Sequence, residues 1–358
     1  MRYCVFIFFT FLISCKDNFQ EFTLFDLNQV DAGCHDLGNG FSIPFDQIVG
    51  GGVSKDGIPS IDNPQFLSIE QVDYLLEDEL VLGVKIGDEV KVFPHRIMDQ
   101  HEVLNGMING KPLSVTFCPL TGTGIAWPRT SDTSYGVSGL LYNSNLIAYD
   151  RKTDSYVSQM FSSGISGKKM CENTGHIQVI ETTWETWKSL YPDSEVLSTE
   201  TGFTRNYGTL AYSTTQIESS VPLFPVNNVD ERLPNYRRVF GIVINHDAKV
   251  FEINDFDENG ELIFDFIHGM KVVVVGNSKK NFVVAFFPIL KGKSISLEFK
   301  DQLLIDENEN HYNLFGEVIS GPDKGSRLES PMYFTGYWFA WVAFYPNLEL
   351  YSRVSLSN

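Results

Sequence analysis

The stretch WETWKSLYPDSEVLS at residues 184–198 recurs 154 residues later as WFAWVAFYPNLELYS at residues 338–352. Both copies have Trp at the first and fourth positions, a Tyr-Pro pair, a Glu and a Ser, and together they hold four of the five tryptophans of the chain. Trp, Trp and Tyr at i, i+3 and i+7 share one helix face, and the proline ends the helix. Each copy therefore predicts a short helix whose aromatic face packs in the core, and Thr182 is the expected N-cap of the first helix.

A second pair of segments repeats in the same order. GVKIGDEVKVF at residues 83–93 and GIVINHDAKVF at residues 241–251 share five of 11 positions. Self-similarity at a fixed spacing is typical of a duplicated unit. We expect two related domains, a first repeat at residues 58–200 and a second at 222–358, joined by a linker at 201–221. The expected fold class is β-rich α+β, with each domain mostly antiparallel strands plus the short aromatic-faced helix.

Composition excludes several classes of protein. The chain has 358 residues, of which 43% are apolar and 13% aromatic, so it is too apolar for a disordered protein. Its 28 Phe and 15 Tyr favour strands over a helix bundle. The formal net charge of -18 argues against a nucleic-acid partner, because phosphate binding requires clustered Lys and Arg.

The N-terminus predicts export. Residues 4–14, CVFIFFTFLIS, form an apolar run that is too short to span a bilayer and fits the core of a signal peptide at residues 1–14. The run ends Leu12-Ile13-Ser14-Cys15, which resembles a bacterial lipobox, so Cys15 is the expected lipidation site. Residues 15–57 then form a tether and an irregular lead, and the protein is expected in the cell envelope, attached to the membrane through its lipid. The alternative is an ordinary cleaved signal with a chance cysteine.

Three cysteines remain after Cys15: Cys34, Cys118 and Cys171. An oxidising compartment permits a disulfide, and three cysteines leave at least one unpaired. A bridge between Cys34 and Cys171 is possible, but the sequence leaves that pairing open.

Reactive side chains are concentrated in the first repeat. His101, Glu102 and Cys118 lie there, whereas Cys118 aligns with Asn277 in the second repeat. The first hypothesis is a transition-metal site (copper, iron or zinc) formed by Cys118 and His101, and completed by Glu102 or by His95, Gln159 or Met160.

Two alternatives stay open. One is a monothiol redox or nucleophilic enzyme that uses Cys118, with His101 as its base and Glu102 beside it. The other is a non-enzymatic envelope module that binds a small molecule or a protein between its two domains. In that case Cys118 is simply a small buried side chain.

Several longer motifs resemble a known family. They are HEVLN at 101–105, VTFCPLTGT at 115–123, GVSGLLYNS at 136–144, YDR at 149–151 and WFAW at 338–341. Together they are similar to the bacterial and archaeal domain of unknown function 3179, over about residues 55–350. The resemblance implies no established activity. Its members typically carry a second cysteine where this chain has Thr121, so a dithiol role is not expected here.

Overall fold

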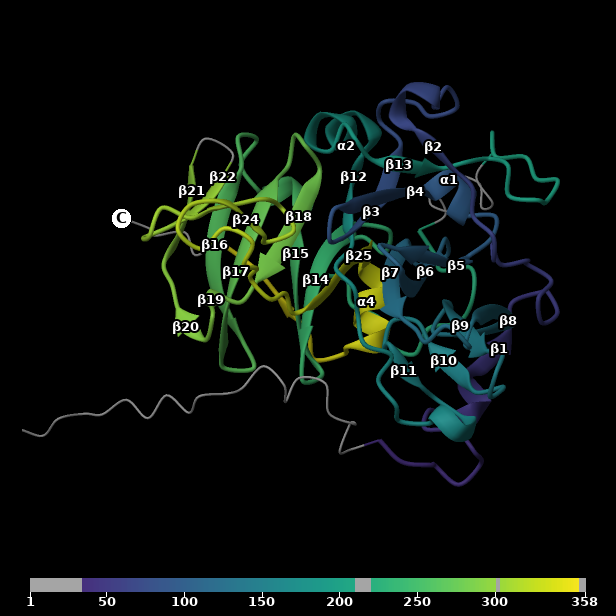
Figure 1. The fold of residues 1–358 in the computed structure, drawn as a ribbon. Helices are drawn as coiled ribbons and strands as arrows, with labels where there is room; N and C mark the ends of the chain where they lie inside the picture. Colours follow the sequence, from purple (N-terminus) through teal and green to yellow (C-terminus); the bar gives the residue numbers. More distant parts are fainter. Residues whose placement is uncertain (1–33, 210–219, 301–302, 354–358) are drawn as a thin grey trace, which may run out of the picture.

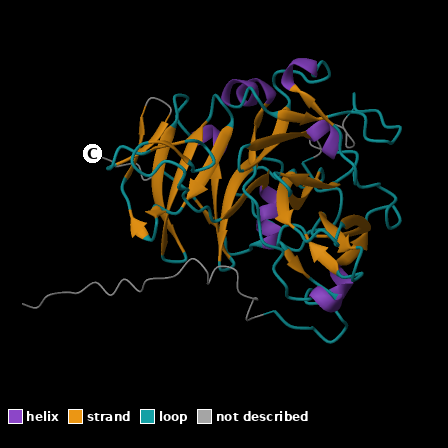
Figure 2. Ribbon diagram, viewed as in Figure 1, coloured by secondary structure: helices purple, strands orange, loops and turns teal. Residues whose placement is uncertain are grey.

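The computed structural model describes residues 34–209, 220–300 and 303–353. The predicted signal peptide and Cys15 lie outside the described residues. Strands dominate the fold, and the α-helices are short (Figures 1 and 2): α1 (His95–Met98), α2 (Trp184–Leu190) and α4 (Trp338–Phe344). The prediction of a β-rich chain is confirmed. Within the described ranges, none of the helices has the length and apolar character needed to cross a membrane.

The first half contains three sheets. A five-stranded sheet has the order β12-β3-β4-β13-β2, and the second has β5, β6 and β7 in sequence. The third has the order β1-β8-β9-β10-β11. The bounds are β1 (Ile48–Gly50), β2 (Phe66–Ser68), β3 (Leu80–Ile86), β4 (Glu89–Pro94), β5 (Val103–Ile108), β6 (Lys111–Cys118), β7 (Thr123–Pro128), β8 (Tyr135–Tyr142), β9 (Asn145–Asp150), β10 (Tyr156–Ser158), β11 (Ser163–Gly164), β12 (Ile180–Thr183) and β13 (Glu195–Leu197).

The second half contains a four-stranded sheet β25-β14-β15-β26, a three-stranded sheet β16-β17-β18, a four-stranded sheet β21-β22-β23-β24 and the hairpin β19-β20. The bounds are β14 (Arg238–Ile244), β15 (Asp247–Glu252), β16 (Glu261–Ile267), β17 (Met270–Asn277), β18 (Phe282–Phe286), β19 (Ile289–Leu290), β20 (Lys293–Ser294), β21 (Leu297–Lys300), β22 (Leu303–Asp306), β23 (His311–Tyr312), β24 (Val318–Ser320), β25 (Met332–Tyr337) and β26 (Glu349–Leu350).

The main sheets of the two halves are connected in the same way. In each, a central hairpin (β3–β4 or β14–β15) has an antiparallel strand on one side and a parallel strand on the other. The antiparallel strand leads directly into the aromatic helix, and the parallel strand follows that helix. The three-stranded sheets β5-β6-β7 and β16-β17-β18 also have the same strand order and the same pairing at the end of the middle strand. Cys118 and Asn277 end their middle strands, and each pairs with the residue five positions later.

The helix α2 begins one residue later than expected. Its N-cap is Thr183, whose hydroxyl accepts from the amide of Thr186 at 3.3 Å. Thr182 instead belongs to β12, and its hydroxyl donates to the carbonyl of Lys280 at 2.6 Å. The predicted cap at Thr182 is therefore wrong, because that side chain is used for a contact with the second half.

Each aromatic helix packs in a core that contains side chains of both halves. We call these cores the α2 core and the α4 core. Trp187 of α2 packs with Phe315, with 6.4 Å between ring centroids, in a cluster rich in valines of β17. Trp338 and Trp341 of α4 lie with Trp127 in the cluster that holds Cys118. Figure 1 shows the yellow α4 beside the blue β7. The halves therefore complete each other's cores, and the predicted site abuts α4.

Candidate functional site

Cys118 lies at the end of β6 and is 1% exposed. Its Sγ is 3.8 Å from the carbonyl oxygen of Ser144. Burial, with a smaller contribution from Glu102, raises the pKa of the thiol to about 11. The thiol is therefore protonated at neutral pH, whereas nucleophiles and metal ligands act as thiolates.

The residues around Cys118 form a closed polar network. The Nδ2 of Asn145 is 2.9 Å from the hydroxyl of Thr121 and 2.7 Å from the Oε1 of Gln159. The hydroxyl of Thr123 donates to the same Oε1 at 2.7 Å, and the Nε2 of Gln159 donates to the hydroxyl of Thr116 at 3.0 Å. All five side chains are buried. A fully bonded buried network specifies one packing arrangement, so Gln159 already has protein partners in place of a metal.

Both ring nitrogens of His101 form hydrogen bonds within the fold. Its Nδ1 is 2.7 Å from the carbonyl oxygen of Pro59, which can only accept, so this nitrogen carries the proton. Burial lowers the pKa of the ring, which favours the neutral form. The Nε2 then accepts from the hydroxyl of Tyr207 at 2.6 Å. Sequence reasoning missed Tyr207, because it lies over a hundred residues away in the predicted linker.

Glu102 is a buried carboxyl group at a residue with φ of 58°. Burial raises its pKa to about 8, and the neighbouring Asp99 contributes in the same direction. Glu102 is therefore mainly protonated at neutral pH, so it is a hydrogen-bond donor more than an anionic ligand.

The predicted metal site gains no support from this geometry. Across residues 34–209, 220–300 and 303–353, there is no group of three or more His, Cys, Asp or Glu side chains that could hold a metal ion. Both ring nitrogens of His101 are already hydrogen-bonded, so neither is left to bind a metal. Cys118 keeps its proton, whereas a metal ligand would be a thiolate. Of the other predicted ligands, Met160 lies in the apolar α4 core.

His95 belongs to an ion cluster that joins the halves. Its Nε2 is 3.2 Å from the Oε2 of Glu181, and the Oε1 of Glu181 accepts from Arg238 of β14. Burial alone would raise the pKa of Glu181, but Arg238 and His95 lower it overall. The cluster therefore fixes β12 and α1 against the second half.

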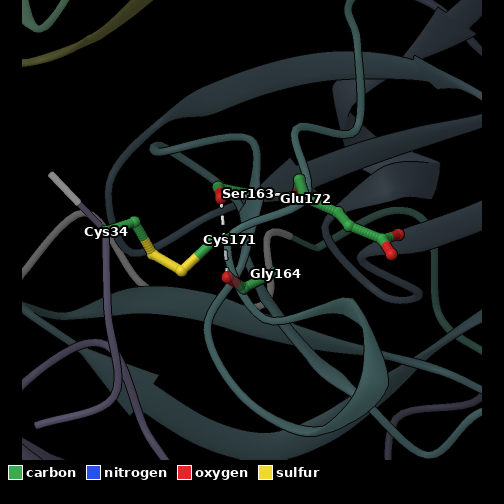
Figure 3. Close-up of a disulfide and its surroundings, with 5 residues drawn as sticks. All are labelled: Cys34, Ser163, Gly164, Cys171 and Glu172. Carbon is green, nitrogen blue, oxygen red and sulfur yellow. Dashed lines mark hydrogen bonds between the residues drawn. A yellow bond between two sulfur atoms is a disulfide. The ribbon is translucent and has the colours of Figure 1, made fainter. Parts of the chain in front are cut away.

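The structure contains the disulfide that the sequence left open. Cys34 and Cys171 are bridged, with their Cα atoms 5.6 Å apart (Figure 3). The bridge fastens the start of the described chain to the loop after β11. Figure 3 also shows the carboxylate of Glu172 pointing away from the sulfur atoms.

The disulfide borders a cavity of about 440 Å³ between the two halves, which we call the junction pocket. The first half contributes Tyr142, Phe161 and the disulfide, and the second half contributes Asn245, His246, Ser330, Met332 and Tyr345. Among the described residues that line it, none is Asp, Glu, Lys or Arg, although these make up 20% of the chain. The pocket therefore suits a molecule without net charge, because an ionised group there would meet no Asp, Glu, Lys or Arg to pair with.

A smaller cavity of about 300 Å³ shares Phe161, His246 and Tyr345 with the junction pocket. It contains one carboxylate, Asp247, whose Oδ2 is 2.8 Å from the Nδ1 of His268. Phe161 thus lines both cavities, and its ring centroid lies 4.8 Å from that of Phe344 in α4. The junction pocket could not be predicted from the sequence, because its lining residues come from segments that lie far apart in the chain.

No curated protein and no solved structure matches the chain. A family model does match: that of DUF3179, described as a protein of unknown function, which covers residues 55–348. Most of the chain lies within this match, and the chain therefore belongs to the DUF3179 family.

Proposed function

We propose that the protein is an exported, lipid-anchored, non-enzymatic module that binds a small uncharged molecule in the junction pocket. The observation that carries the proposal is the pocket itself, about 440 Å³ in volume and without Asp, Glu, Lys or Arg among its described lining residues. This volume is in the usual range for small-molecule sites, and such sites are often found where two structural units meet.

The cysteine chemistry favours binding over catalysis. A thiol enzyme requires a low pKa and an accessible sulfur, and Cys118 is buried with its pKa raised. His101, the expected base, is bonded to Pro59 and Tyr207. Neither residue lines the junction pocket.

Export and lipidation at Cys15 are supported by the sequence and by the redox state of the chain. The run at residues 4–14 and the lipobox-like Leu12 to Cys15 remain the basis for them. Structural disulfides form in oxidising compartments and are rare in the cytosol, so the Cys34–Cys171 bridge fits an exported protein. The expected test is metabolic labelling with a radioactive fatty acid, which the wild type incorporates and Cys15→Ser does not.

We also infer that the two halves descend from one duplicated unit. Asp150 and Asp306 support this, because each ends a strand and accepts a hydrogen bond from the backbone amide two residues later, at 2.8 and 2.9 Å. On this interpretation residues 58–200 and 222–358 are the two copies, which later diverged at Cys118 and Asn277.

Ligand binding is tested with a variant that fills the junction pocket. Ser330→Trp adds a large ring at a residue whose hydroxyl has no hydrogen-bond partner among the described residues, so little is lost from the fold. Native mass spectrometry of the full chain after incubation with a mixture of uncharged small molecules should detect a complex for the wild type and none for Ser330→Trp. The matched control is Ser320→Trp on the exposed end of β24, which should still bind. Equal binding by all three proteins would reject the junction pocket as the site.

A further inference from the structure

The junction pocket has two kinds of wall, and together they limit the chemical class of ligand that it can bind. One wall is aromatic and aliphatic, with Phe161 half-buried between Tyr142 and Tyr345 at centroid distances of 6.3 and 6.1 Å. Since Phe344 supports the same ring at 4.8 Å, Phe161 is held as a fixed platform. A rigid aromatic face binds the C–H face of a ligand without ordering a flexible side chain.

The other wall consists of uncharged hydrogen-bonding groups. The side-chain Oδ1 of Asn173 accepts from the backbone amide of Gly175 at 2.6 Å, which leaves the side-chain NH2 group as a donor. The hydroxyl of Ser330 is buried and has no partner within the described part of the chain. Asn245 lies in an exposed hairpin turn at the rim, with φ of 49°. Amides and hydroxyls donate and accept, so together they suit a ligand that carries several hydroxyl groups.

From these two walls we infer that the junction pocket binds a neutral saccharide. The inference rests on the proposed function and deepens it. A sugar ring has an apolar C–H face for Phe161 and a rim of hydroxyl groups for Asn173, Asn245 and Ser330. A purely apolar ligand would leave those polar groups unpaired, which costs binding free energy. An ionised ligand would meet no Asp, Glu, Lys or Arg among the described lining residues, and the nearby carboxylate of Glu172 points away from the disulfide (Figure 3).

The test uses the full chain in detergent, with maltose, cellobiose and N-acetylglucosamine as probes in saturation-transfer NMR and titration calorimetry. Indole serves as a neutral apolar probe and glucuronate as a charged sugar. We expect at least one neutral sugar to bind and glucuronate to bind at least tenfold more weakly. Asn245→Asp should raise the Kd of that sugar about tenfold, since it replaces donor groups by a negative charge in a turn that tolerates Asp.

The matched control is Asn109→Asp, the same change in a turn outside the pocket, with φ of 48°, which should leave the Kd unchanged. If indole binds and Ser330→Trp abolishes that binding while no sugar binds, the saccharide inference fails and the proposed function stands. If neither sugars nor indole bind, both fail. Glucuronate binding as tightly as the neutral sugars would also overturn the inference.

Discussion

The indole of Trp187 lies directly on Gly83, so that a Cβ at residue 83 would fall 1.8 Å from its Cη2. The second half has the same relationship: a Cβ at Gly241 would fall 2.3 Å from the Cζ2 of Trp341. In each half the glycine lies on the first strand of the central hairpin and the tryptophan on the aromatic helix. The glycine is needed because only a missing side chain lets the ring reach the sheet.

We therefore expect Gly83→Ala to destabilise the protein by about 3 kcal/mol, since a rigid ring blocks the added methyl group. Because Trp187 also packs on Phe315 of the second half, the loss should appear in one cooperative transition for the whole chain. Urea unfolding followed by tryptophan fluorescence and by circular dichroism measures both points.

Gly50→Ala is the matched control, because a Cβ there meets nothing within 4 Å. It should change the free energy of unfolding by less than about 1 kcal/mol. Adding Trp187→Leu to Gly83→Ala should recover part of the loss, as expected for residues in contact. Additive losses in the double variant would contradict the proposed clash.

The repeated segments allowed much of the fold to be predicted. Gly83 and Gly241 start the second pair of repeated segments, and Trp187 and Trp341 belong to the first pair. In the first half, Ile86 pairs with Glu89 across the turn at Gly87-Asp88 inside the repeated segment. The mixing of side chains from both halves in each core could not be predicted, because the repeated segments indicate which strands and helix form one unit but not how two units pack together.

The candidate site was harder to predict from the sequence than the fold. A cysteine and a histidine in one repeat suggest a shared site, but their partners decide their chemistry. Both ring nitrogens of His101 are hydrogen-bonded, one to Pro59 and the other to Tyr207, and these two residues come from distant segments. Arg151 of the YDR motif likewise donates from its guanidinium to Asp56 and Asp62, at 2.9 and 3.2 Å. Such contacts are set by tertiary packing, which a single sequence does not reveal.

Cys118 should react slowly with thiol reagents. Its burial and its pKa of about 11 leave little thiolate at pH 7, so iodoacetamide should label it only when the chain unfolds. Mass spectrometry of peptides after timed labelling, with and without urea, measures this. Rapid labelling of the native protein would reinstate the thiol-enzyme hypothesis.

The disulfide should stabilise the chain considerably, because its cysteines are 137 residues apart. Cross-linking distant residues restricts the unfolded chain, and the double variant Cys34→Ser/Cys171→Ser should lose about 2–4 kcal/mol. Urea unfolding with and without reductant is the measurement. Reductant should destabilise the wild type and leave the variant unchanged, whereas equal sensitivity of both proteins would exclude the bridge as the cause.

Glu102 should make the protein less stable as the pH rises. Its pKa is about 8 in the folded chain, against 4.5 for an ordinary glutamate, so the folded state holds a proton that the unfolded state releases first. The contribution is fully present below pH 4.5 and falls by about 1.4 kcal/mol per pH unit until the pH passes about 8. Glu102→Gln, which mimics the protonated side chain, should remove this part of the slope.

Urea unfolding at pH 5, 6, 7 and 8 measures the slope, with the exposed Glu298→Gln as the control that should keep it. If Glu102→Gln and wild type lose stability in parallel over this range, Glu102 is ionised in the folded protein and the buried-proton interpretation is wrong.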